Sequence, residues 1–77
     1  MISYEEFRKR VIERFTELSQ ALSAQEIEDY FENSQEAKSV LENRYRGYSE
    51  RYEKGELPDN LIPSCVASVA YCLYMMY

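Results

Sequence analysis

The sequence contains no histidine and no tryptophan, and only two glycines, two prolines and two cysteines among its 77 residues. Without histidine the chain cannot build Ser-His or Cys-His nucleophilic sites or the usual zinc sites. The few glycines and prolines exclude collagen-like, proline-rich and flexible-linker sequences. No Gly-rich phosphate-binding loop is present either. These absences argue against an enzyme and against any cofactor.

Basic residues are also outnumbered, because nine Lys and Arg stand against 14 Asp and Glu and give a formal net charge of -5. An acidic balance opposes binding to nucleic acid and to anionic membrane surfaces, and it is compatible with a basic protein partner. Hydrophobic residues at 45% and aromatic residues at 14% supply a core, so disorder is not expected. We expect one small domain over residues 1–77, which self-association or a partner would help to stabilise.

The two cysteines, Cys65 and Cys72, lie about 10.5 Å apart along one predicted helix, which is too far for a disulfide bond. Reduced thiols are typical of cytoplasmic proteins, and an apolar helix makes them unreactive. Residues 1–6 lack the basic and apolar regions of a signal peptide. The sequence therefore predicts a cytoplasmic protein.

A short motif, apolar-Ser-x-x-Glu-apolar, occurs twice, at residues 2–7 and 22–27. In each copy Ser can accept a hydrogen bond from the amide three residues later, and Glu can reach back to the Ser amide. Each copy therefore predicts the start of a helix. Apolar residues at helical spacing predict three helices, over about residues 4–21, 24–32 and 35–54. Lys54 and Gly55 are expected to end the third.

The last stretch, residues 60–77, carries no charged side chain. We expect a fourth helix over about 60–76, capped by Asp59 or Asn60, with Pro63 tolerated in its first turn. A helix that is apolar on all sides is either the centre of a bundle or a membrane anchor. Its short length, its proline and its polar side chains favour the bundle.

The expected fold is therefore all-α, a small four-helix bundle, orthogonal or up-down, with a short second helix and an apolar central C-terminal helix. The residues expected to face the other helices are Ile62, Cys65, Val66, Val69, Leu73 and Met76. A membrane-anchored peptide remains a different hypothesis for the same stretch.

Acidic residues gather over residues 24–36, which contain no Lys or Arg. Glu26 holds the position of a capping glutamate, whereas the others form either a solvated face or a surface for a basic protein. Those candidate protein-binding residues are Glu28, Asp29, Glu32 and Glu36. No metal site is expected, because histidine and a calcium-type turn are missing.

Tyrosine occurs eight times, which is more than so small a core can bury with every hydroxyl satisfied. Exposed tyrosines are typical of protein interfaces. Helical spacing equally allows core positions for Tyr48 and Tyr52, and Tyr74 lies near the chain end. These three complete the candidate protein-binding residues.

We therefore expect a non-enzymatic adaptor, inhibitor or regulator that binds a protein partner, with a homodimer through the C-terminal helix as a further expectation. The alternative is a DNA-binding regulator, because residues 24–46 have the outline of a degenerate helix-turn-helix. In that hypothesis Lys38, Arg44 and Arg46 meet DNA, and residues 8–10 contact its backbone. The carboxylate of Glu36 at the start of the second of these helices would repel phosphate.

Overall fold

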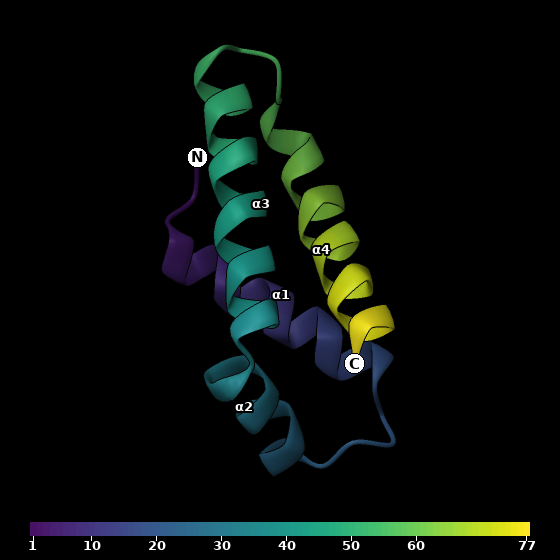
Figure 1. Cartoon of the computed structure of the whole chain (residues 1–77). Coiled ribbons are helices and arrows are strands. Elements are labelled where there is room, and N and C mark those ends of the chain that lie inside the picture. Colours follow the sequence, from purple (N-terminus) through teal and green to yellow (C-terminus); the bar gives the residue numbers. More distant parts are fainter.

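The computed structural model describes residues 1–77 and contains helices but no strands (Figure 1). The elements are α1 (Tyr4–Leu18), α2 (Ala24–Asn33), α3 (Gln35–Glu53), a 3-10 turn η1 (Asp59–Leu61) and α4 (Ile62–Met76). α3 and α4 run antiparallel side by side, α1 crosses behind both, and α2 extends beyond the lower end of α3 (Figure 1). The predicted small all-α four-helix bundle with a short second helix is confirmed.

One cluster of 12 buried residues forms the core. Its members are Phe7, Val11 and Phe15 of α1; Ile27 and Phe31 of α2; Ala37 and Leu41 of α3; and Ile62, Val66, Val69, Ala70 and Leu73 of α4. α4 makes its most extensive contact with α1 and also packs on α3. The hydroxyl of Tyr30 on α2 donates to the Leu73 carbonyl at 3.0 Å, so α4 contacts every other helix.

The ends of the helices differ from the expectation at two places. α1 ends at Leu18, because the buried Ser19 becomes the C-cap and its hydroxyl bonds back to the Phe15 carbonyl. α4 begins without a side-chain cap, after the turn η1, so the predicted cap at Asp59 or Asn60 is wrong.

The expected end of α3 at Lys54-Gly55 is confirmed. Gly55 has a φ of 75° and its amide donates to the Tyr52 carbonyl, while the Glu56 amide donates to the Arg51 carbonyl. This pair of bonds satisfies carbonyls that the last helical turn would leave free, and it requires a residue that tolerates positive φ.

The inward face of α4 is predicted correctly except at one position. Ile62, Cys65, Val66, Val69 and Leu73 are all buried, as expected. Met76 is 41% exposed, so its predicted place against the other helices is wrong. It lies in the last turn of α4, where its sulfur is 4.0 Å from the Cys72 sulfur on the same helix.

Candidate protein-binding surfaces

The acidic residues of α2 are divided between a structural role and an open surface. Glu26 closes a capping box, because its Oε1 accepts from the Ser23 amide at 3.1 Å while the Ser23 hydroxyl accepts from the Glu26 amide. Glu28, Asp29, Glu32 and Glu36 are all exposed. The structure therefore places the four predicted candidates on the surface, although not on one face.

Asp29 and Glu32 each have a partner within the protein. The side-chain amide nitrogen of Gln25 donates to the Asp29 carboxylate at 3.0 Å, one turn away on α2. Arg8 of α1 forms an ion pair with Glu32 at 3.0 Å, with the two side chains 31% and 59% exposed. An ion pair this exposed contributes about 0–1 kcal/mol, so Arg8 is available to exchange partners.

An open groove of 310 Å³ lies between α1 and α2. Its apolar lining is Ile12, Ala24, Ile27 and Phe31, and its polar lining is Arg8, Thr16, Glu28 and Glu32. Ile27 and Phe31 are core residues, so the floor of the groove is fixed by the packing of the bundle. The groove is thus an apolar depression with two carboxylates on its α2 side.

The three predicted tyrosines do not share a surface. Tyr48 is half-buried, and its hydroxyl accepts from Arg44 at 3.1 Å while the Arg44 guanidinium lies 5.7 Å from its ring centre. Tyr52 is also half-buried, and a hydrogen bond with Asp59 raises the pKa of its hydroxyl. Tyr74 lies on α4, exposed, with its ring edge-on to Phe15 at 6.3 Å. Tyr48 and Tyr52 thus serve mainly to pack α3.

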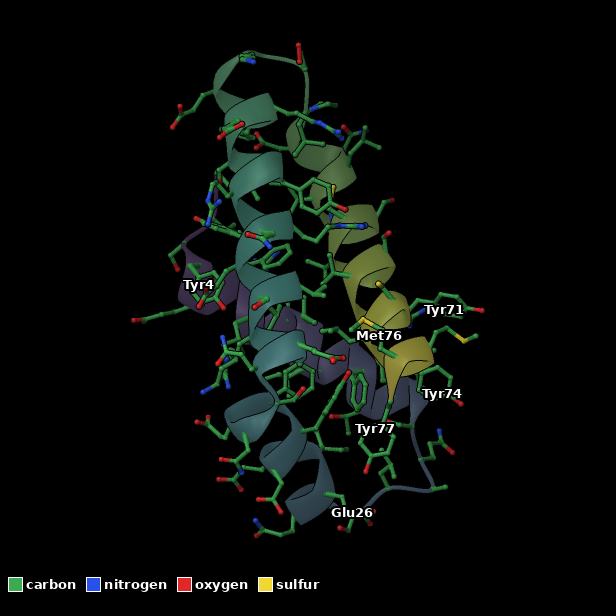
Figure 2. The ribbon with its side chains drawn as sticks, in the orientation of Figure 1. Tyr4, Glu26, Tyr71, Tyr74, Met76 and Tyr77 are labelled. Carbon is green, nitrogen blue, oxygen red and sulfur yellow. The ribbon has the colours of Figure 1, made fainter.

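The C-terminal end of α4 carries a group of exposed apolar side chains, of which only Tyr74 was among the predicted site residues. The others are Tyr71, Met75, Met76 and Tyr77. Tyr71 and Tyr74 project from the side of α4 opposite α3 (Figure 2). The uncharged residues 60–77 gave the signal, because three amphipathic helices of modest length cannot cover an apolar helix on every side.

Burial controls the ionisation of the groups with shifted pKa values inside the bundle. It raises the pKa of Tyr4, Tyr30 and Cys65, because the charged form of each would lose its hydration. At neutral pH these side chains therefore stay protonated. The Cys65 thiol in particular is held in its unreactive form, as the sequence predicted for this apolar helix.

Several cations of the alternative DNA-binding hypothesis have partners within the chain. Arg8 and Arg10 form ion pairs with Glu32 and Glu6. Arg44 donates to the hydroxyls of Tyr48 and Ser68, at 3.1 and 3.2 Å. Arg44 is thereby turned toward the protein, whereas the exposed ion pairs of Arg8 and Arg10 contribute only about 0–1 kcal/mol and leave both cations able to change partners.

No family model matches this sequence, and the searches of curated proteins and of solved structures returned no match. No helix combines the length and the apolar character needed to cross a membrane.

Proposed function

We propose that this protein is a non-enzymatic binding module, an adaptor, inhibitor or regulator, that holds a basic amphipathic segment of a partner protein in the α1/α2 groove. The observation that carries the proposal is the apolar depression of 310 Å³ with Glu28 and Glu32 on one side. An amphipathic helix would place apolar side chains on Ile12, Ile27 and Phe31 and its Lys or Arg side chains beside the two carboxylates.

Two features of the chain support a basic partner over an acidic one. The net charge of -5 attracts cationic segments at long range and speeds their association. At short range, Glu28 has no ion-pair partner, and Glu32 can exchange Arg8 for a cation of the partner. The groove is lined by only one cation of its own, Arg8. We also propose a cytoplasmic location, which the two unpaired cysteines, Cys65 and Cys72, support.

The test uses a synthetic helical peptide of about 15 residues, built from Leu on one face and Lys on the other, and a matched Leu/Glu peptide. Titration into the ¹⁵N-labelled protein should shift the amide resonances of Thr16, Ala24 and Glu28 with the Leu/Lys peptide and not with the Leu/Glu peptide. Glu28→Lys should weaken binding about threefold to tenfold. Glu50→Lys makes the same charge change at an exposed residue of α3 and should bind normally.

Binding of both peptides alike, or equal weakening by the two variants, would refute the groove as the site. The alternative function is tested on the same sample with duplex DNA over a range of salt concentrations. Tight binding that falls steeply with salt would mean that the protein is a DNA-binding regulator instead. A pull-down from cells that naturally contain the protein completes the test. The charge-reversed double variant Asp29→Lys/Glu32→Lys should lose the captured partners, and capture of the same partners would mean that the acidic residues are only solvated.

A further inference from the structure

α4 leaves one uncovered stripe along its whole length. Ser64, Ser68, Tyr71 and Met75 are exposed and recur at intervals of four, three and four residues, which places them on one side of a helix. We call these four residues the outer face of α4. Tyr71 is 56% and Met75 65% exposed, whereas the opposite side of the helix is buried in the core. The outer face is about 17 Å long and carries no charged side chain.

The α3 side of this stripe is positive near the start of α4. Arg44 of α3 donates to the Ser68 hydroxyl at 3.2 Å. Burial raises the pKa of Cys65, and the positive charges of the nearby Arg51 and Arg44 lower that pKa in part. Both arginines therefore lie beside the first half of α4, as expected from the antiparallel course of the two helices (Figure 1).

The same side is negative near the end of α4. Tyr30 bonds the Leu73 carbonyl, and its pKa is raised by burial and further by Cys72 and Glu36. Glu36, in the first turn of α3, therefore lies close to the last turns of α4. On the α3 side of the outer face, Arg51 and Arg44 therefore lie beside the first half of α4, and Glu36 lies beside its last turns.

We propose that the occupant of the outer face is a second copy of this chain, with the two α4 helices antiparallel. A two-fold axis perpendicular to α4 and lying in the interface exchanges the ends of the helix and keeps the α3 flanks on the same side. Arg51 of each copy then approaches Glu36 of the other, whereas Arg44 lies near the two-fold axis, where it is bonded to Ser68 of its own copy. The contact forms twice, as the symmetry of a two-fold dimer requires.

The shape of the stripe fits the same arrangement. Its first half has the small residues Ser64 and Ser68, bordered by Ala67, and its second half has the large side chains of Tyr71 and Met75. Antiparallel packing places the large side chains of one copy over the small residues of the other and aligns the helix dipoles favourably. The uncharged face also lets two molecules of net charge -5 associate without burying a charge.

The area of the molecule is sufficient for such a dimer. A stable interface buries about 800 Å² from each partner. The monomer exposes 5028 Å² in total, so about one sixth of its surface would be covered. With extents of 38 × 22 × 19 Å, a broad side of the bundle that includes α4 and its flanks can supply that area.

Sedimentation of the purified chain over a wide concentration range tests the proposal. We expect a monomer–dimer equilibrium with a dissociation constant of about 10–100 µM. Tyr71→Glu should weaken association about tenfold or more, because it places a charge at the centre of the contact. Thr16→Glu makes the same charge change in the α1/α2 groove and should leave association unchanged; circular dichroism checks that both variants fold.

A charge exchange tests the antiparallel arrangement. Arg51→Glu and Glu36→Arg should each weaken association about threefold, and the double variant should recover it. Lys9→Glu, exposed on α1, serves as the charge control for the first of these.

Three results would overturn the proposal. A chain that is monomeric at about 1 mM has no such interface. A dimer broken by Thr16→Glu and not by Tyr71→Glu uses the groove instead of α4. Failure of the double variant to recover association excludes the antiparallel geometry. Peptide binding in the α1/α2 groove is measured separately. Its result does not depend on the dimer, because the groove and the outer face of α4 share no residue.

Discussion

The hydroxyl of Tyr30 on α2 donates a hydrogen bond to the backbone carbonyl of Leu73 on α4 at 3.0 Å, across 43 positions of sequence. The Leu73 carbonyl also accepts from the Tyr77 amide at 3.1 Å, so it has two donors in the last turn of α4. The Tyr30 ring packs edge-on to Tyr77, 5.0 Å between centres. This tyrosine therefore holds the short second helix against the end of the last one.

Removing that hydroxyl should loosen α2. We expect Tyr30→Phe to lower the free energy of unfolding by about 1 kcal/mol, because the ring still packs but the hydrogen bond to Leu73 is lost. Urea unfolding followed by circular dichroism measures the change. Tyr71→Phe is the matched control, since Tyr71 is exposed and should lose less than about 0.5 kcal/mol. Equal losses in the two variants would contradict the role assigned to Tyr30.

Stability should fall at alkaline pH. Burial raises the pKa of Tyr4, Tyr30 and Cys65, and the hydrogen bond with Asp59 raises that of Tyr52. As the pH rises past about 9 for the thiol and 10 for the phenols, the unfolded chain loses these protons first. The folded state then binds more protons than the unfolded state, so the free energy of unfolding decreases with pH.

Below about pH 8 both states keep these protons, and this contribution to stability is fully present. Urea unfolding between pH 7 and 11 measures the slope. Tyr30→Phe removes one of the shifted groups, so its stability should decline less steeply above pH 10 than that of the unchanged chain. A variant that declines in parallel with the unchanged chain would count against Tyr30 as a contributor.

The two copies of the capping motif should differ in strength. At Ser23 both hydrogen bonds of the capping box form. At Ser3 only one forms, in which the serine hydroxyl accepts from the Glu6 amide, because the Glu6 carboxylate pairs with Arg10 at 2.9 Å. We expect Ser23→Ala to cost about 1 kcal/mol in the free energy of unfolding. Glu26→Gln should cost less, since an amide oxygen can still accept from the Ser23 amide.

Thermal unfolding compares these variants with Glu28→Gln, which makes the same change as Glu26→Gln two residues further along α2, where no capping bond is lost. Glu28→Gln should change the free energy of unfolding by less than about 0.5 kcal/mol. If it destabilises the protein as much as Ser23→Ala, the capping box is not the source of the effect.

The inward face of α4 should tolerate neither a charge nor a cavity. Val69 is fully buried in the middle of α4, so Val69→Asp should leave an unpaired carboxylate in the core and abolish folding. Leu73→Ala tests the same face more gently and should cost about 2–5 kcal/mol by opening a cavity. Met75→Ala on the outer face is the control for stability and should unfold like the unchanged chain at about 1 µM protein, where the expected dimer is dissociated. Circular dichroism and urea unfolding report all three.

The helices themselves follow from the sequence. Ser3 and Ser23 start α1 and α2 as predicted, and Gly55 ends α3, because caps and stop signals act through bonds between residues a few positions apart. Periodic apolar residues such as Phe7, Val11 and Phe15 identify the buried side of a helix in the same local way.

The candidate site was predicted only in part. The exposure of Glu28 and its neighbours follows from their charge, but a charge pattern does not reveal that α1 lies beside α2 to form a groove. Tyr48 and Tyr52 lie at positions that suit either a core or a surface, and only the arrangement of the neighbouring elements decides that they pack. Tyr48 lies against Phe7 of α1, and Tyr52 lies beside Asp59 of η1.

The chain alone determined four helices, most of their ends and the apolar character of α4, because these depend on neighbouring residues. The sequence also predicted most of the buried side of α4, and tertiary structure decided how far the other helices cover it. Met76 is exposed because the cover depends on where distant helices cross α4, which neighbouring residues do not determine. The crossing of α1 behind α3 and α4 buries Val69 and Leu73 and leaves Tyr71 and Met75 exposed.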